Sequence, residues 1–442
     1  MRFEISHLRV WTYVALLLCA PAGEAHAGQK EASGQSRPRG AGRVSEDAPA
    51  LLVRALELLR GGKVEEAEPL VRRALAAEPS NADAHALLGV ILDQRGLARE
   101  AEGEYRAAVR LDPKAVAARA NLGVLLARVG RTAEAAAAFE SVLKDVPGHP
   151  QATFNLGLAL FQLKRHEEAA ALLSSPAALA QDAPVAFYHL GLIESEAGRA
   201  EEAAQFWQRA LALRENYPEV HFALAEELRR QRRYEGAAEF YERAVAGDPA
   251  KLVYRVRLGG VLMLLSRFDR ALGVFTDAAA RFPDSAAAHY FVGIAARGRG
   301  DYERAEAALR RSLELEAGSA DALAQLGFVV GERGRDAEAE VLLRRALERD
   351  ARHFYAGYDL GRLLVRGRRY ADALNILRGA ARVRANDPGV HYQMFIALSR
   401  LGQKGEAERE LALFKKFDEE RKARRAAGGV EEIEEALPQP PN

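Results

Sequence analysis

The sequence is nearly free of cysteine, and Cys19 is the only one among its 442 residues. Zinc sites of the usual cysteine-rich type need several such ligands, and the H-E-x-x-H motif of zinc hydrolases is absent as well. No glycine-rich loop follows a strand-like segment in the way that a phosphate-binding site requires. From these absences we predict no catalytic residues, no metal site and no cofactor.

The sequence also lacks an excess of charge of either sign. It holds 63 Lys and Arg residues against 62 Asp and Glu residues, which leaves a formal net charge of +1 at pH 7. Proteins that bind nucleic acids or acidic membrane surfaces usually carry a basic excess or a basic block. We therefore expect neither nucleic acid nor a membrane surface as a partner.

The apolar run near the N-terminus is too short to span a bilayer. It follows Arg2 and Arg9 and precedes an Ala-His-Ala sequence that ends at Ala27, which is the layout of a secretory signal. We expect residues 1–27 to be removed by cleavage after Ala27, and the mature protein to be periplasmic or extracellular without membrane insertion. A lipid anchor at Cys19 is less favoured, because a large leucine precedes that cysteine, and an uncleaved anchor is a further alternative.

A unit of 34 residues dominates the rest of the chain and is clearest at 82–115. Its two segments, 83–95 and 98–111, repeat apolar residues at the three- and four-residue spacing of an amphipathic helix. Gly96 lies where the first helix should end, and Pro113 follows the end of the second. The unit is therefore expected to be a helical hairpin.

A column of glycines recurs at the same interval. It consists of Gly89, Gly123, Gly157, Gly191, Gly259, Gly293, Gly327 and Gly361, and Ala55, Ala225 and Phe395 occupy the slots without glycine. An alanine follows each slot by twelve residues, and a large apolar residue such as Phe139 often follows four residues later. A glycine that faces an alanine lets two helices approach closely, and we expect the large residue to fill the space beside that contact.

Glycine also recurs in the turn between the two helices of seven units. These residues are Gly62, Gly96, Gly130, Gly198, Gly300, Gly334 and Gly402. A helix that ends in the left-handed conformation needs a residue without a Cβ at that point. The fourth unit differs in another way, because Pro176 lies where the second helix continues elsewhere, and we predict a shortened or kinked helix there.

The order Leu-Gly, then Ala, then an aromatic residue or Leu, then Pro resembles the tetratricopeptide repeat, which has the same period. In one unit these residues are Leu122, Gly123, Ala135, Phe139 and Pro147. The resemblance covers residues 48–421 and implies an all-α fold, a right-handed superhelical α-solenoid of eleven hairpins. The expected units are 48–81, 82–115, 116–149, 150–183, 184–217, 218–251, 252–285, 286–319, 320–353, 354–387 and 388–421. A flexible linker at 28–47 and a helix end with a disordered acidic, Pro-containing tail at 422–442 complete the chain.

The resemblance also implies a function, because the first helices of such repeats line a concave groove that binds extended peptides or partner helices. Signal, linker, repeats and tail account for every residue, so no segment remains for a catalytic domain and we expect no enzyme. We predict a scaffold that binds a protein or peptide partner. The alternative is a structural subunit of a cell-envelope assembly or exopolysaccharide-export complex, and the sequence leaves partner and oligomeric state open.

The candidate groove residues precede the glycine slot by two or three positions. They are Asn121, Phe154, Asn155, Tyr188, His189, Phe222, Tyr290, Gln325, Tyr358, Asp359, Tyr392 and Gln393. Amides can hydrogen-bond to a peptide backbone of any sequence, and tyrosine offers a broad contact with little entropy loss. The alternative for the aromatic residues is packing between repeats. Histidines recur in one slot, but they lie whole repeats apart, so packing is favoured over a metal site.

Overall fold

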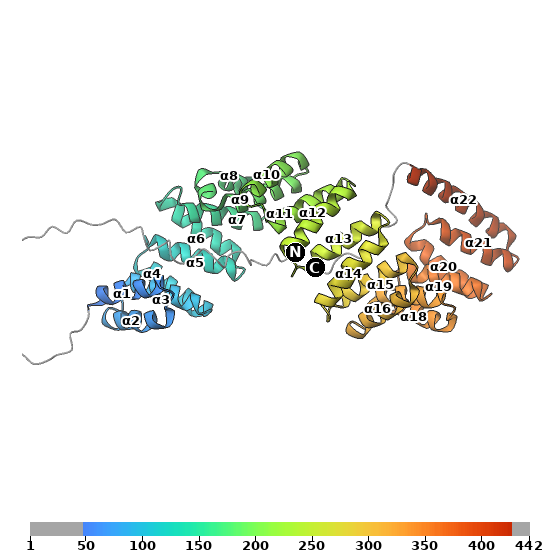
Figure 1. The fold of residues 1–442 in the computed structure, drawn as a ribbon, viewed down its shortest axis with the longest axis horizontal. Helices are drawn as coiled ribbons and strands as arrows, with labels where there is room; N and C mark the ends of the chain where they lie inside the picture. The colour runs from blue at the N-terminus through green and yellow to red at the C-terminus, as the bar shows by residue number, and fades with distance from the viewer. Residues whose placement is uncertain (1–46, 427–442) are drawn as a thin grey trace, which may run out of the picture. The chain divides into compact units, whose positions relative to one another are not determined.

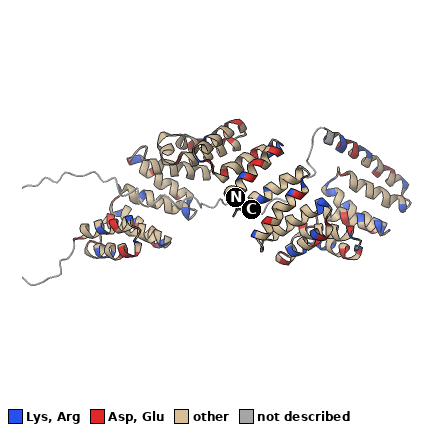
Figure 2. Cartoon of the chain, viewed as in Figure 1, with Lys and Arg blue, Asp and Glu red and all other residues tan. Residues whose placement is uncertain are grey.

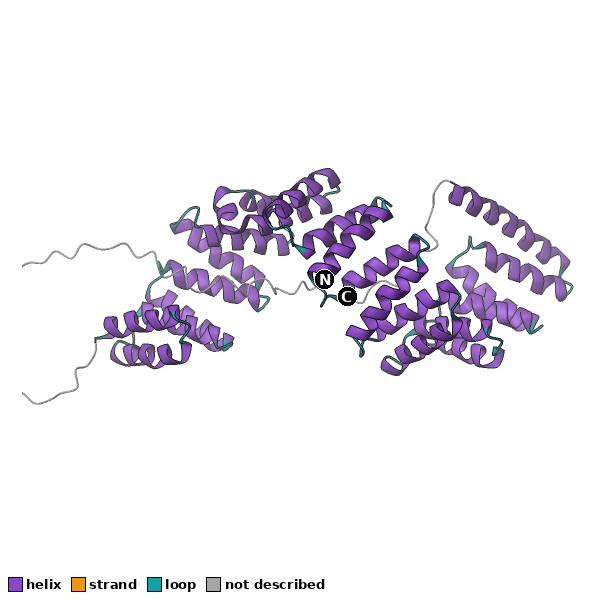
Figure 3. Ribbon diagram, in the orientation of Figure 1, coloured by secondary structure: helices purple, strands orange, loops and turns teal. Residues whose placement is uncertain are grey.

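A computed structural model describes residues 47–426, and all regular structure in that range is helical (Figures 1 and 3). Twenty-two helices and no strand occur between these residues, which confirms the predicted all-α fold. The expected signal at 1–27, the linker before residue 47 and the tail after residue 426 lie outside the described residues. Among the helices of the described range, none is long and apolar enough to cross a membrane.

The chain divides into two compact units, and the division falls between Glu215 and Asn216. The helices of the first unit are α1 (Ala48–Arg60), α2 (Val64–Ala77), α3 (Ala82–Gln94), α4 (Ala98–Leu111), α5 (Val116–Arg128), α6 (Thr132–Asp145), α7 (Pro150–Gln162), α8 (His166–Leu173), α9 (Pro176–Glu196) and α10 (Ala200–Leu213). Those of the second unit are α11 (Pro218–Arg230), α12 (Tyr234–Gly247), α13 (Leu252–Leu264), α14 (Phe268–Arg281), α15 (Ala286–Arg299), α16 (Tyr302–Leu315), α17 (Ala320–Glu332), α18 (Asp336–Arg349), α19 (Phe354–Arg366), α20 (Tyr370–Val383), α21 (Pro388–Arg400) and α22 (Lys404–Ala426).

The helices of each unit are stacked as hairpins. Each odd-numbered helix packs against the even-numbered helix that follows it, and each even-numbered helix packs against the next odd-numbered helix of the same unit. Odd-numbered helices begin every 34 residues, with the exception of α9. The odd-numbered helices are called first helices below, and the even-numbered ones second helices.

The glycine column marks the closest approach within a hairpin. A Cβ added to Gly89 would lie 2.6 Å from Cδ1 of Tyr105, and one added to Gly123 would lie 2.7 Å from Cε1 of Phe139. Both rings are fully buried. The large side chain therefore covers the glycine itself, and our expectation that it would fill the space beside a glycine–alanine contact was wrong in this detail. The glycine is needed because the ring occupies the position that a Cβ would take.

The turn between the helices of a hairpin has one conformation throughout the described residues. All seven predicted turn glycines have a positive φ, between 74° and 85°. The other four hairpins have Lys164, Arg232, Ser266 and Arg368 at the same position, with φ between 57° and 62°. This conformation costs a residue with a Cβ roughly 1–2 kcal/mol. The packing of the two helices therefore imposes the turn even where the residue disfavours it.

The fourth hairpin has the shortened second helix that Pro176 predicted. Helix α8 ends at Leu173 after eight residues, and Pro176 is in the first turn of α9, where its missing N–H leaves no hydrogen bond unmade. Helix α9 is itself interrupted at Asp182, whose φ and ψ of −157° and 86° are not helical. The Asp182 carboxylate accepts a hydrogen bond from the Val185 N–H at 3.2 Å and so caps the helix that continues the 34-residue register.

Ion pairs connect successive hairpins inside each unit, and Figure 2 shows both signs of charge interspersed along the helices. Arginines at the interhelix turns donate to glutamates on the preceding second helix, as Arg131 does to Glu102 at 2.5 Å. The carboxylate of Glu306 is buried and accepts from Arg333 at 2.5 Å and from Arg335. Burial opposes ionisation of Glu306, but the arginines outweigh it and hold its pKa below the usual value.

Candidate functional site

One face of each first helix carries the residues that could meet a partner. We define the first-helix stripe as the positions two before, one after and four after the glycine slot, which share one side of a helix because they are three residues apart. In α15, α17 and α19 these residues are Phe291, Ile294, Arg297, Gln325, Phe328, Gly331, Asp359, Arg362 and Val365. Helix α17 contacts both α15 and α19, so the stripes of these three hairpins are adjacent.

The second unit holds a stack of two arginines on an aromatic ring. The guanidinium carbon of Arg297 lies 4.6 Å from the ring centroid of Phe328, and that of Arg362 lies 5.2 Å from it. These distances are within the range of cation–π attraction. Arg297 also donates a hydrogen bond to the amide oxygen of Gln325, which is buried. Three first helices, α15, α17 and α19, thus contribute to one cluster.

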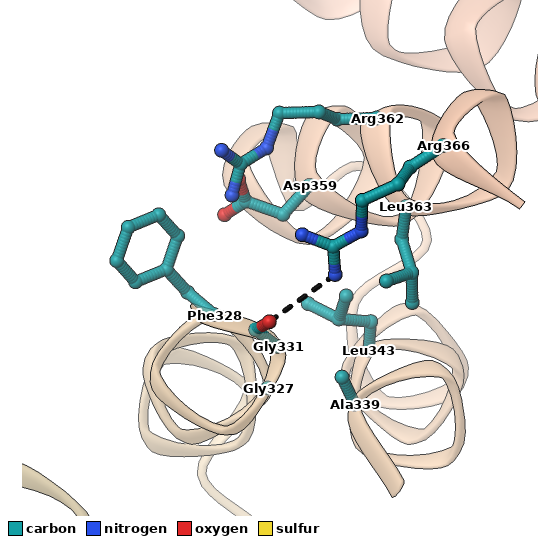
Figure 4. A pocket seen from close by; sticks show the side chains of 9 residues that line it. All are labelled: Gly327, Phe328, Gly331, Ala339, Leu343, Asp359, Arg362, Leu363 and Arg366. Carbon is teal, nitrogen blue, oxygen red and sulfur yellow. Dashed lines mark hydrogen bonds and ion pairs between the residues drawn. The ribbon is translucent and has the colours of Figure 1, made fainter. Parts of the chain in front are cut away.

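A buried carboxyl group lies in the same cluster (Figure 4). Asp359 has a carboxylate oxygen 3.6 Å from the Arg362 guanidinium, which also pairs with Glu332 at 2.8 Å. Burial raises the pKa of Asp359 to about 6, although Arg362 and Arg297 oppose that shift. The carboxyl group is therefore mostly ionised at pH 7 and takes up its proton at a higher pH than an ordinary aspartate.

Beside this cluster lies a small hollow of about 20 Å³, and Figure 4 shows the residues that line it. The lining residues are Gly327, Phe328, Gly331, Ala339, Leu343, Asp359, Arg362, Leu363 and Arg366. Most of these are apolar or lack a side chain. Arg366 reaches across and donates to the backbone oxygen of Gly331 at 3.2 Å, and it also pairs with Asp336 at 2.5 Å. The hollow is therefore apolar inside, and its edge carries charged groups of both signs.

The first unit has a hollow of about 30 Å³ at the equivalent place in the repeat. It is lined by Val124, Ala127, Phe139, Asn155, Leu158, Ala159 and Gln162. Every one of these positions lies 204 residues, six repeats, before a position that lines the hollow of the second unit. Asn155 and Gln162 stand where Asp359 and Arg366 stand in the second unit, so the edge here is amide instead of charged.

The structure brings some of the predicted groove residues to these hollows and places others elsewhere. Asn155 lines one hollow, Asp359 lines the other, and Gln325 belongs to the arginine cluster. Asn121 lies half-buried on α5 and lines neither hollow. Gln393 is half-buried on α21.

The predicted aromatic residues are mostly packed between helices. Phe154 and Tyr290 keep only 8% and 7% of their surface exposed, so little of either is available to a partner. The ring of Phe222 packs on that of Tyr254, with centroids 4.9 Å apart, and Tyr358 is stacked with a neighbouring ring of α19. Tyr392 is the most open of the set, at 42% exposed. These placements favour the packing alternative for the buried members.

Tyr188 and His189 belong to an aromatic cluster in the first unit. The ring of His189 is edge-on to those of Tyr188 and Phe161, at centroid distances of 5.1 and 5.0 Å. Burial lowers the pKa of His189 to about 4, so the ring is neutral at physiological pH. The indole N–H of Trp207 donates to the backbone oxygen of Tyr188 at 3.2 Å.

Two of the recurring histidines contact glutamates on the second helix of their own hairpin. His85 pairs with Glu104 at 2.6 Å, and His391 pairs with Glu410 at the same distance. Across residues 47–424 no group of three or more His, Cys, Asp or Glu side chains is arranged to hold a metal ion.

Sequence reasoning missed the arginine cluster and Gly331. It considered only positions two and three before the glycine slot, whereas Phe328 and Arg362 follow the slot by one and Arg297 follows it by four. Continuing the predicted face by three residues at a time would have found them, because the helical period repeats in both directions.

Models of known protein families match the chain along its repeats. A model described as tetratricopeptide repeat matches residues 52–116, 94–144, 120–184, 188–251, 257–322 and 358–425, and a second model of that description matches 319–353. No curated protein matches the sequence.

Solved structures are similar to this chain at low identity. They include MamA from Desulfovibrio magneticus RS-1, with 20% identity over 39% of this chain and 97% of that one, at a TM-score of 0.36. Yeast Tom70 has 13% identity over 88% and 99% of the two chains, at 0.38. The Cut9–Hcn1 assembly of the APC/C has 12% identity over 89% and 97%, at 0.45.

Proposed function

The chain belongs to the tetratricopeptide repeat family, and on this premise we propose that it is a non-catalytic scaffold that holds a partner protein on its first-helix stripe. Members of this family bind other proteins, and their first helices form the binding face. The proposal places the contact in the second unit, on α15, α17 and α19.

The observation that carries this proposal is the Arg297–Phe328–Arg362 cluster. Arginine and aromatic side chains are the residue types that contribute most binding energy at protein interfaces. Phe328 is only half-buried, so part of its ring remains available for contact. A segment of a partner that lies across the three helices would cover the cluster and remove it from water, which strengthens cation–π attraction.

We further propose that the protein acts after export, in the periplasm or outside the cell. Support comes from the N-terminal pattern of Arg2, Arg9, an apolar run and a small-residue cleavage site at Ala27. Sequencing the N-terminus of the protein recovered from each cell fraction tests this directly. We expect Gly28 as the first residue, and an intact N-terminus in the cytoplasm would refute the export proposal.

Affinity capture from an envelope extract tests the scaffold proposal. The full-length protein is compared with the double variant Phe328→Ala/Arg362→Ala and with Arg345→Ala, which removes an exposed arginine from the second helix α18. We expect the wild type and Arg345→Ala to retain the same partner and the double variant to lose it. Melting curves establish that all three proteins are folded. Equal capture by the double variant would exclude the cluster as the binding site.

The same extract distinguishes the alternative, a structural subunit of an envelope assembly. Such a subunit would sediment with a large complex in the absence of any added bait, and its partners would depend on the whole array. A scaffold would instead retain a small set of proteins whose binding depends on the stripe. Sedimentation of the wild type and the double variant side by side therefore separates the two functions.

A further inference from the structure

The last hairpin leaves an aromatic side chain uncovered. In earlier hairpins of the second unit, the aromatic residue three positions before the slot packs on the first helix of the next hairpin. Phe222 packs on Tyr254 of α13, with ring centroids 4.9 Å apart, and the hydroxyl oxygen of Tyr358 lies 2.9 Å from the place that a Cβ on Gly389 of α21 would take. Tyr392 holds the same position in α21, and no further hairpin follows within residues 47–426. Its side chain is therefore 42% exposed.

Tyr392 forms a terminal aromatic surface with Phe395 and Phe414. Its ring centroid lies 5.1 Å from that of Phe414 on α22 and 6.4 Å from that of Phe395 on α21, and both phenylalanines are half-buried. Lys415 and Lys416 follow Phe414 and are exposed, and neither forms an ion pair with a side chain of residues 47–424. A segment that fits this surface therefore offers apolar side chains flanked by carboxylates.

The sequence that follows α22 has this chemistry. Residues 430–437 read Val-Glu-Glu-Ile-Glu-Glu-Ala-Leu. Val430, Ile433 and Leu437 recur at the three- and four-residue spacing that places side chains on one side of a helix, and four glutamates lie between them. Glycines at positions 428 and 429 precede this segment, and glycine permits the chain to reverse its direction.

The tail is long enough to return to the terminal aromatic surface. Phe414 lies twelve residues before Ala426, the last residue of α22, which corresponds to roughly 18 Å along a helix. The eleven residues 427–437 can span about 36 Å when fully extended, so the distance is well within their reach. A segment attached by a short linker also acts at an effective concentration of millimolar order, which favours it over a separate molecule of the same chemistry.

We propose that residues 430–437 fold back along α22 and cover the terminal aromatic surface. Ile433 and Leu437 lie on the aromatic rings, and the glutamates pair with the two lysines. The segment, which composition alone predicts to be disordered, is then ordered where it meets α22 and closes the end of the stack in place of a further hairpin. This contact is separate from the partner surface proposed above, which lies on α15, α17 and α19, so either can exist without the other.

Fluorescence quenching of a tryptophan reporter tests this contact in the full-length protein. Tyr392→Trp introduces the reporter, Trp11→Phe removes a second signal, and the remaining Trp207 is only 1% exposed and should not respond to acrylamide. We expect weak quenching of the reporter when the tail is unchanged. Ile433→Ser/Leu437→Ser should raise the quenching constant severalfold, because the rings are then left open to water.

Gln439→Ser/Asn442→Ser is the matched control, because it changes the tail outside residues 430–437 and should leave the quenching weak. Melting curves establish that every variant is folded. Equal quenching with the unchanged and the Ile433→Ser/Leu437→Ser tail would overturn the proposal. Protection of the reporter that increases with protein concentration would identify a second copy as the occupant and would equally overturn it.

Crosslinking provides an independent test in the chain with its natural Tyr392. A zero-length carbodiimide should join a glutamate of residues 431–435 to Lys415 or Lys416, and Ile433→Ser/Leu437→Ser should lose this product. A mixture of isotope-labelled and unlabelled protein shows whether both residues belong to one chain, as we expect. Absence of the product from the unchanged protein would contradict the contact. Neither result would alter capture of a partner by the first-helix stripe, so failure of one proposal is distinguishable from failure of the other.

Discussion

The glycine column makes a quantitative prediction about stability that can be tested within one hairpin. Gly89→Ala adds a methyl group to α3 at the point where the ring of Tyr105 from α4 covers the backbone. The new Cβ would lie 2.6 and 2.7 Å from two ring carbons, well inside van der Waals contact, so the ring must move or the two helices must separate. Tyr105 is fully buried, which leaves its ring little room to move.

The expected cost follows from two opposing effects. Overpacking a well-packed core costs typically 1–3 kcal/mol. Alanine is intrinsically better than glycine inside a helix by about 1 kcal/mol, which offsets part of that cost. Gly103→Ala, at an exposed position of α4 with no atom within 4 Å of the new Cβ, gains the helix preference without the clash. The two variants should therefore differ by about 1–3 kcal/mol, with Gly89→Ala the less stable.

Hydrogen exchange of the amides of α3 and α4 is the suitable assay, because a repeat array can open one hairpin at a time and need not unfold in two states. Gly89→Ala should lower protection in both helices, and Gly103→Ala should raise it slightly. The hairpin α11–α12 has Ala225 beside Tyr241, both fully buried, so the fold can accommodate alanine at the slot, and we expect a loss of stability without loss of the fold. Equal protection in the two variants would refute the close-approach explanation.

Three further predictions concern strain and charge. Ser266 has a left-handed φ of 57°, and Ser266→Gly should relieve strain of ~1–2 kcal/mol there. This gain exceeds the ~0.5–1 kcal/mol that glycine costs through the entropy of the unfolded chain, so the melting temperature of the variant should rise slightly. Glu306→Gln should lower the free energy of unfolding by roughly 1–3 kcal/mol at pH 7. Because the pKa of Glu306 is lowered in the folded protein, urea titrations should show the difference in stability between wild type and variant shrinking as the pH falls below about 4.5. Asp359→Asn should raise the free energy of unfolding by up to about 3 kcal/mol at pH 7.5. This value follows from the difference between the pKa of about 6 in the folded protein and the ordinary 3.8, and the gain in stability should disappear by about pH 4. A constant difference between pH 4 and pH 7.5 for Asp359→Asn would contradict the burial of its charge.

The sequence predicted the hairpins because their determinants are local and repeated. Helical periodicity, the turn glycines and the column from Gly89 to Gly361 all recur at one interval, so each unit confirms the register of the others. Pro176 predicted the shortened helix for an equally local reason. The left-handed turn at Ser266 could be predicted only by its place in the series, since serine does not favour that conformation.

The candidate site was less predictable because it depends on contacts between repeats. Positions near the slot identified Asp359 and Gln325, but nothing in their sequence neighbourhood places Arg297 over Phe328, 31 residues later. The hollow is harder still to predict, because its lining residues come from three helices, α17, α18 and α19. The hollow forms only when the neighbouring first helix, α19, is packed beside α17.

A photo-reactive side chain introduced at the partner surface tests the central claim most directly. Benzoylphenylalanine at position 328, on the stripe of α17, is compared with the same residue at position 341, where Val341 is 57% exposed on the second helix α18. After irradiation in an envelope extract, we predict a crosslink to one protein from position 328 and none from position 341. A crosslink that forms only from position 341, or none from position 328 when the partner is present, would contradict this account.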